Sequence, residues 1–159
     1  MTPTADICDR FGDRVAVAEP LFQDLGSRTA FAGPIETVQV FEDNALVRQV
    51  LETPGAGRVL VVDGRGSRRC ALVGGRLARL AAENGWSGIL VNGCVRDLAE
   101  IAAADIGMKA LAGCPMPPAK TGAGERGVPV SFAGVTFTPG HSLWADLDGV
   151  VVGPAELQV

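Results

Sequence analysis

The sequence predicts an α/β fold with a central mixed sheet, flanking helices and added antiparallel strands near the C-terminus. The segments 58–64 and 87–93 are continuous apolar runs, which are typical of strands buried on both faces of a sheet. Helical patterns follow at 74–86 and 96–107, and this alternation indicates βαβ units. Two short β-rich runs separated by Ala-Gly predict a hairpin within 128–139.

The first third of the chain predicts a helix, a strand and a second helix. The opening residues have apolar positions at near-helical spacing, with Thr4 as a candidate N-cap. Residues 34–41 alternate between apolar and polar side chains, as a half-buried strand does. Residues 43–52 have one apolar face, which predicts an amphipathic helix that begins with Asp43 or Asn44 as its cap.

The central segments place a glycine pair and a charged pair after apolar strands. If the runs 58–62 and 88–92 are parallel neighbours, the Gly-Gly helix start (74–75) and the Arg-Asp pair (96–97) open on the same edge of the sheet. The run 108–111 predicts the next strand. We therefore expect the two pairs to converge on one ligand.

The last third differs in character from the centre. Residues 113–127 are rich in Gly and Pro and predict a long loop, and loops of this length are often functional. The stretch 139–146 also reads as a loop, in which His141 receives no role, and 148–153 predicts a final strand. No linker or internal repeat divides the chain, so we expect a single domain over 1–159.

Composition excludes several classes of function. Only 20% of the residues are charged while 47% are hydrophobic, which favours a homo-oligomer with buried faces. The net charge is −4 and the 14 basic residues are scattered, so nucleic-acid binding is not expected. The four cysteines form no Cys-x-x-Cys pair, which argues against a zinc cluster. An acidic N-terminus and short apolar runs predict neither a signal peptide nor a membrane span, so we expect a cytoplasmic protein with no membrane contact.

Two glycine-rich stretches are better explained as turns than as nucleotide sites. A Gly-x-Gly-x-x-Gly pattern at 122–127 lacks the strand before it and the helix after it that pyrophosphate binding requires. The stretch Asp-Gly-Arg-Gly-Ser at 63–67 follows a strand, but no Walker lysine comes after it, because the only lysines are Lys109 and Lys120.

The glycine pair and the charged pair each have a structural and a functional interpretation. Gly74 and Gly75 open a helix whose first amides can bind an anion, or they form only a tight turn. Asp97 can cap the next helix, and Glu100 completes a pair that resembles a capping box. Capping leaves Arg96 unexplained, whereas a guanidinium at the carboxyl end of a parallel strand suits a carboxylate ligand.

Four segments together resemble the regulator of ribonuclease activity A family, which includes 4-hydroxy-4-methyl-2-oxoglutarate aldolases. They are GGRLARLAAENGWSGILVNGCVRDLAEI, DIGMKAL, KTGAGERGVPVSFAGVTFTPG and ADLDGVVV, and the resemblance covers nearly the whole chain. The family's active members are associated with Gly, twenty residues, Arg-Asp, two residues and an acid. Here Gly75, Arg96, Asp97 and Glu100 match that pattern.

The resemblance implies a swivelling β/β/α domain that assembles as a homotrimer or a hexamer of two trimers. It further implies a class II pyruvate aldolase that also decarboxylates oxaloacetate and needs a divalent cation, Mg²⁺ or Mn²⁺. By carry-over, Asp97 is both catalytic and the metal ligand, and Arg96 is catalytic and contacts the 2-oxo acid end. The substrate carboxylate is expected at the amides of Gly74, Gly75, Arg76 and Leu77.

The chemistry supports a metal over a Schiff base, because Lys109 lies in an apolar strand and Lys120 in a flexible loop. There are three candidates for the general acid/base: a metal-bound water oriented by Glu100, and Glu125 or Asp146 from a neighbouring subunit. The competing function is a regulator that inhibits ribonuclease E by protein contact. A third possible function is a methyltransferase of quinone synthesis, but the chain lacks a convincing glycine-rich loop to bind a methyl donor, which argues against it.

Overall fold

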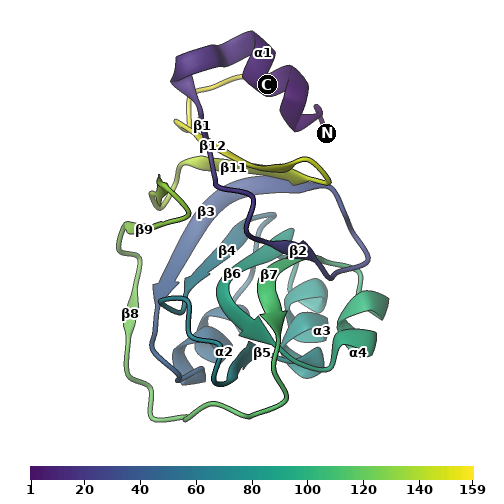
Figure 1. The fold of residues 1–159 in the computed structure, drawn as a ribbon, viewed down its shortest axis with the longest axis vertical. Coiled ribbons are helices and arrows are strands. Elements are labelled where there is room, and N and C mark those ends of the chain that lie inside the picture. Colours follow the sequence, from purple (N-terminus) through teal and green to yellow (C-terminus); the bar gives the residue numbers. More distant parts are fainter.

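A computed structural model describes residues 1–159 and shows one ten-stranded mixed sheet, with a separate two-stranded hairpin beside it (Figure 1). The helices are α1 (Thr4–Phe11), the 3-10 turn η1 (Gly12–Arg14), α2 (Ala45–Leu51), α3 (Gly75–Glu83) and α4 (Leu98–Ala103). The strands are β1 (Ala16–Val17), β2 (Gln23–Asp24), β3 (Phe31–Gln39), β4 (Val59–Asp63), β5 (Ala71–Val73), β6 (Gly88–Val95), β7 (Gly107–Gly113), β8 (Glu125–Arg126), β9 (Val130–Phe132), β10 (Val135–Phe137), β11 (Ser142–Asp146) and β12 (Gly149–Gly153). No helix is long and apolar enough to cross a membrane.

The sheet has a parallel centre and antiparallel edges, which confirms the mixed α/β class. Its order is β1-β12-β11-β3-β4-β6-β7-β2, with β5 beside β6 and β8 beside β3. Strands β3, β4, β6 and β7 run parallel to one another, so the runs 58–62 and 88–92 do pair in parallel, which was the condition for the expected convergence. Strands β9 and β10 form the predicted hairpin.

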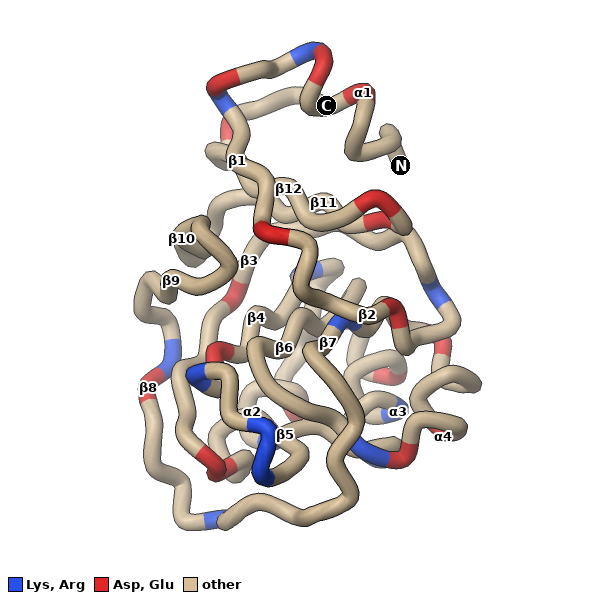
Figure 2. The backbone as a smooth tube through the Cα atoms, in the orientation of Figure 1, with Lys and Arg blue, Asp and Glu red and all other residues tan.

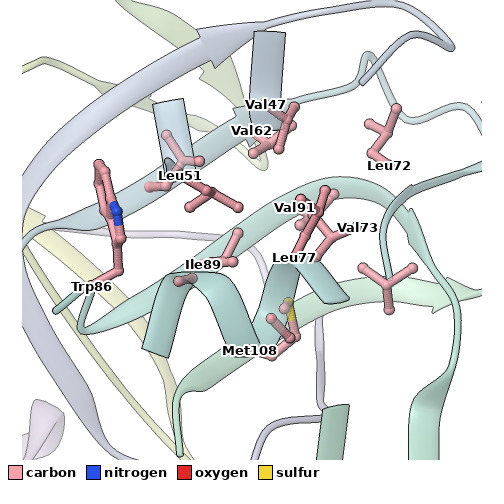
Figure 3. Packing of buried hydrophobic residues seen from close by; sticks show 14 of the residues in the cluster. Val47, Leu51, Val62, Leu72, Val73, Leu77, Trp86, Ile89, Val91 and Met108 are labelled. Atoms are coloured by element: carbon pink, nitrogen blue, oxygen red, sulfur yellow. The ribbon is translucent and has the colours of Figure 1, made fainter. Parts of the chain in front are cut away.

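The central strands are buried on both faces, as their continuous apolar character indicated. On β4, Leu60 and Val62 belong to a cluster of 21 residues shared with α2, α3 and α4 (Figure 3). Val59 and Val61 belong to a cluster of 13 residues on the opposite face, which includes residues of the β9–β10 hairpin. Because apolar area leaves water on both faces, this strand gains hydrophobic stabilisation from both layers.

Several strands escaped the sequence prediction, among them the two-residue strands β1, β2 and β8, and two of the missed strands, β11 and β5, change the topology. Residues 139–146 were expected to form a loop, but Ser142–Asp146 is β11, which lies between β3 and β12 with Leu143 and Ala145 fully buried. His141 lies exposed just before β11. The Gly-Gly helix start was expected to follow the run 58–62, but β5 intervenes and continues the line of β4 along β6. Strand β11 lies between the adjacent β12 and the distant β3, and β5 has three residues that pair with the end of β6, so local periodicity reveals neither strand.

The N-terminal helix begins where it was expected but is held differently. Thr4 is not the cap, since Pro3 occupies that position and makes no side-chain cap bond. The Thr4 amide and hydroxyl instead donate to the Asp146 carboxylate at 2.8 and 2.7 Å. This contact fixes α1 to β11, and α1 lies with both termini at the end of the molecule away from α2, α3 and α4 (Figure 1).

The other helices are shorter than predicted. The segment 43–52 forms α2 only over Ala45–Leu51, and 96–107 forms α4 only over Leu98–Ala103. At the start of α2, Asn44 makes no side-chain cap, whereas Asp43 accepts a hydrogen bond from the Ala45 amide at 3.2 Å. The segment 113–127 is largely irregular, as expected, and it runs along the edge of the molecule from β7 to β8 (Figure 1).

Candidate active site

Two strand-to-helix junctions lie side by side at the carboxyl edge of the sheet. Strand β5 leads into α3 and β6 leads towards α4, and the two strands pair with Val73 opposite Val95. The Arg96 amide donates to the Val73 carbonyl oxygen at 3.0 Å. The glycine pair and the Arg-Asp pair therefore lie at the same edge of the sheet, as expected. The strand that leads into the glycine pair is β5, however, and not β4.

Asp97 does not cap α4 with its side chain. Its backbone is left-handed, with φ 60° and ψ 48°, and it makes no side-chain cap bond. Its Oδ2 atom instead accepts a hydrogen bond from the Gly75 amide at 3.1 Å, across the junction. A left-handed residue costs about 1–2 kcal/mol, though Asp tolerates it better than most. The capping interpretation is wrong, because the carboxylate is turned towards the start of α3.

Glu100 also differs from the capping-box interpretation. Its Oε2 atom pairs with Arg79 Nη1 at 2.6 Å, and both side chains are about half exposed. A Cβ added at Gly75 would lie 2.7 Å from the Glu100 Cβ, and one added at Gly74 would lie 2.9 Å from Asp97 Oδ2. A side chain at position 75 would therefore have to displace α4, whereas one at position 74 would have to displace only the Asp97 carboxylate.

The first turn of α3 leaves two amides unused. The Gly75 amide donates to Asp97, and the Ala78 amide donates to the Gly74 carbonyl oxygen at 3.1 Å. The amides of Arg76 and Leu77 make no hydrogen bond, while the Leu77 side chain packs into the core (Figure 3). Free amides at a helix start attract an anion, so this turn can bind a carboxylate.

Arg96 extends over the strand ends without a carboxylate partner. Its Nη1 atom donates to the Pro115 carbonyl oxygen at 3.3 Å, and the side chain is half-buried. Backbone hydrogen bonds hold the first part of the 113–127 segment to the same edge. The Cys114 amide donates to the Val95 carbonyl oxygen at 2.9 Å, and the Ala71 amide donates to the Met116 carbonyl oxygen at 2.9 Å. The guanidinium is thereby placed beside Asp97 with donors still free.

These groups line a pocket of about 640 Å³. Its lining consists of Asn44, Ala45, Arg48, Gln49, Glu52, Ala71, Gly74, Arg76, Leu77, Arg79, Arg96, Asp97, Glu100, Pro118 and Lys120. The wall formed by α2 and Lys120 were not among the predicted site residues, and the polar face of α2 was the only local signal for that wall.

The charges of the pocket are partly neutralised. Arg48 pairs with Glu52 at 2.9 Å, and Arg79 pairs with Glu100. The remaining cations, which form no ion pair, are Arg76, Arg96 and Lys120. Asp97 likewise has no cationic partner. The pocket therefore combines positive charge with one carboxylate that has no cationic partner. Outside it, Lys, Arg, Asp and Glu positions are spread over the whole chain (Figure 2).

The other sequence candidates lie outside this pocket. Lys109 is buried in β7 and pairs with Asp24 at 2.8 Å, so its amine is already engaged. Asp146 binds Thr4, and Glu125 lies exposed on β8; neither lines the pocket of its own chain. Burial raises the pKa of the Cys70 and Cys94 thiols, which keeps them protonated at neutral pH. No group of three or more His, Cys, Asp or Glu side chains is arranged to bind a metal.

A family model described as Aldolase/RraA, of the RraA-like family, matches residues 4–152. The chain belongs to the RraA-like family. This RraA-like protein is 55% identical over 150 residues to one from Alkalilimnicola ehrlichii, which is provisionally named 4-hydroxy-4-methyl-2-oxoglutarate aldolase; the match covers 94% of this chain and 93% of the relative.

Two solved structures of RraA-like fold share nearly the whole architecture. A crystal structure described as an S-adenosylmethionine:2-dimethylmenaquinone methyltransferase from Geobacillus kaustophilus is 52% identical, with a TM-score of 0.96, and covers 98% of this chain and 97% of that chain. A structure described as the RNA-processing inhibitor RraA from Thermus thermophilis is 47% identical, with a TM-score of 0.96, and covers 99% and 96%. One fold thus appears under three functional descriptions, so function has to be argued from the site.

Proposed function

We propose that the protein is a divalent-metal-dependent lyase that cleaves 4-hydroxy-4-methyl-2-oxoglutarate, or a related 4-hydroxy-2-oxo diacid, to pyruvate. We further propose that it decarboxylates oxaloacetate at the same site. The observation that carries this proposal is the unpaired Asp97 carboxylate beside the unpaired Arg96 guanidinium and two free amides. The aldolase name of the Alkalilimnicola relative supports the same reaction.

In this proposal the start of α3 binds the substrate carboxylate. The amides of Arg76 and Leu77 are free to donate, and Gly74 and Gly75 let the ligand approach the backbone. Arg96 contacts the 2-oxo acid end, where its planar donors suit carboxylate and keto oxygens. The substrate is thereby oriented with its reacting bond above the ends of β5 and β6.

The residues present fit a hard divalent cation held mainly by water. Asp97 is the pocket carboxylate that forms no ion pair, whereas Glu52 and Glu100 are committed to arginines. Mg²⁺ is commonly bound through one or two carboxylates while it keeps several waters, and Mn²⁺ accepts similar oxygen ligands. When bound, the cation supplies Lewis-acid stabilisation of the negative charge that develops on the substrate's keto oxygen.

Both reactions need the same assistance from the protein. Cleavage of the C–C bond and loss of carbon dioxide each leave the enolate of pyruvate, and Arg96 contributes positive charge where that oxyanion forms. Lys109 is buried and paired, so it does not supply a Schiff base. Lys120 lines the pocket but lies exposed among polar groups, unlike the desolvated lysines that usually form Schiff bases. No single residue of the pocket is assigned the proton transfer.

The decisive experiment compares the wild type with Asp97→Asn, because Asn tolerates left-handed backbone and its amide oxygen can still accept from Gly75. We expect wild-type protein with Mg²⁺ or Mn²⁺ to release pyruvate from the diacid, chelator to stop release, and added metal to restore it. Asp97→Asn should fold normally, bind Mn²⁺ at least tenfold more weakly and turn over poorly. Arg14→Gln, which changes an exposed residue outside the pocket, is the matched control.

Two results would contradict the proposal. One is full turnover by Asp97→Asn, and the other is pyruvate release that survives chelator and is abolished by borohydride trapping. The second result would show a Schiff base on a lysine instead.

The regulator function remains a second candidate, because the Thermus structure of the same fold is described as an RNA-processing inhibitor. We propose that any contact with ribonuclease E would use the surface and not Asp97, so Asp97→Asn would keep inhibition while losing turnover. We also propose a homotrimer or a hexamer, supported by exposed apolar side chains such as Phe41, Met116 and Leu147. Four free thiols support a reducing compartment such as the cytoplasm.

A further inference from the structure

Asp43 is a buried carboxylate whose partners come mostly from a distant loop. Only 3% of Asp43 is exposed, between β3 and α2. Its Oδ2 atom accepts from the Thr121 amide at 2.7 Å and from the Thr121 hydroxyl at 2.5 Å. Its Oδ1 atom accepts from the amides of Ala45 at 3.2 Å and Gly122 at 3.3 Å. Burial alone would raise the pKa of Asp43, but these hydrogen bonds outweigh it and hold the pKa below its usual range.

Hydrogen bonds to residues 42–44 fix the backbone on both sides of Lys120. The Ala119 amide donates to the Glu42 carbonyl oxygen at 2.9 Å, and the Ala119 carbonyl oxygen accepts from the Asn44 amide at 3.1 Å. Thr121 is bound to Asp43 on the other side. Lys120 therefore lies in an irregular segment, as expected, but the residues on either side of it are held by hydrogen bonds to the start of α2.

Lys120 presents an uncommitted charge to the pocket. It forms no hydrogen bond or ion pair within the chain and lines the same cavity as Arg96 and Asp97. Of the three uncommitted cations, Arg76 belongs to the helix turn and Arg96 to the junction that together form the proposed 2-oxo acid site. Lys120 alone comes from a separate chain segment. A cation held apart from the first carboxylate site suits a second carboxylate.

We propose that Lys120 binds the distal carboxylate of a 2-oxo diacid and that Asp43 is the positioning residue that holds Lys120 at the pocket. This inference rests on the proposed function, since it names the residue that selects diacids over monoacids at that site. Asp43 acts through the backbone of the loop and does not touch the substrate. The selectivity for two carboxylates would then depend on a contact between residues 78 positions apart, from Asp43 to Thr121.

The test is equilibrium binding by calorimetry, in the presence of Mg²⁺, of two probes with the same 2-oxo acid end. The probe 2-oxoglutarate has a second carboxylate, and 2-oxobutyrate lacks it. We expect Lys120→Gln to weaken 2-oxoglutarate about tenfold, or about 1.4 kcal/mol, and to change 2-oxobutyrate less than twofold. Lys120→Arg should retain most of the diacid affinity, and Arg14→Gln should change neither probe.

The positioning role is tested at Thr121, because Asp43→Asn risks misfolding of a buried site. Thr121→Val removes one donor to Asp43 at nearly constant volume, and Thr121→Ser restores the hydroxyl. We expect Thr121→Val to lower the diacid-to-monoacid affinity ratio several-fold and Thr121→Ser to recover it. A merely structural role would lower stability without moving that ratio.

Three results would overturn the inference. They are equal losses of both probes in Lys120→Gln, unchanged binding of both probes, and selective loss in Arg76→Gln instead. A wild type that cleaves diacids yet binds the two probes equally would refute the role of Lys120 and leave the proposed aldolase intact. A wild type that releases no pyruvate from any diacid would refute the proposed function itself.

Discussion

Replacing Gly75 by alanine tests whether the close approach of α3 and the Arg96–Asp97–Glu100 segment is essential. Gly75 is the buried first residue of α3, and an added Cβ would lie 2.7 Å from the Glu100 Cβ and 2.9 Å from its Cδ. The Glu100 carboxylate can rotate away, but its Cβ moves only with the α4 backbone. The substitution should therefore push α3 and α4 apart.

The expected loss of stability is small because two effects oppose each other. Alanine is favoured over glycine inside a helix by about 1 kcal/mol, and by less at the first helical position. Overpacking of a close contact costs about 1–3 kcal/mol. The net change is about 0–2 kcal/mol of destabilisation, and each kcal/mol lowers the melting temperature of a domain of this size by about 2–4 °C. The variant should remain folded at 25 °C.

The expected loss of turnover is much larger. The Gly75 amide holds Asp97 Oδ2 at 3.1 Å, so separation of α3 from the next junction displaces the proposed metal ligand from the amides that hold the substrate. A misplacement of about 1 Å commonly costs about 100-fold in rate. We therefore expect the rate of pyruvate release to fall about 100-fold in a protein that melts only a few degrees lower.

The assay is pyruvate release with saturating Mg²⁺, measured together with thermal unfolding. The matched control is Gly93→Ala on β6, where the tightest contact of an added Cβ would be with the Leu72 Cδ1 methyl group at 3.3 Å, which can shift. Wild-type turnover in folded Gly75→Ala would refute the reasoning. A loss of turnover that only follows the unfolded fraction would refute it as well.

Three further predictions address single contacts. Arg96→Lys keeps the positive charge but loses the planar guanidinium donors, so kcat/KM for the diacid should fall about 10–100-fold while Mn²⁺ affinity stays unchanged. Loss of Mn²⁺ binding would show instead that Arg96 positions the metal ligand. Lys109→Met should lower the free energy of unfolding by about 2 kcal/mol in urea titration and should leave turnover intact. The loss is smaller than for a fully buried pair because 25% of the Asp24 side chain is exposed. Burial would raise the pKa of Asp146, but hydrogen bonds, chiefly from Thr4, outweigh burial and leave the pKa lowered. The stabilisation that these hydrogen bonds give is therefore complete above about pH 4 and is lost as the pH falls through the folded-state pKa. The stability difference between wild type and Asp146→Asn should therefore shrink under strong acid, and a constant difference would contradict the assignment.

The amino-acid sequence determined the parallel centre of the sheet and the edge at which the candidate site lies. Strands β4 and β6 were predictable because their apolar character is continuous, and α3 because its apolar residues recur with helical period. The Gly-Gly pair and the Arg-Asp pair marked the two junctions because each follows a predicted parallel strand, and the spacing between them matches the pattern of the family that the sequence resembles. These features are local, or they follow from the general rule that parallel strands end at one edge.

Tertiary structure alone decided which partner each polar group takes. The spacing from Asp97 to Glu100 is equally compatible with a capping box, yet their carboxylates bind Gly75 and Arg79 of another helix. Strand β11 and the contact that holds Lys120 depend on residues far away in the chain, which no local period encodes. Periodicity reports which face of an element is buried, but a hydrogen bond forms with whatever the folded register brings within reach. The direction of the Asp97 carboxylate was therefore decided by the pairing of β5 with β6.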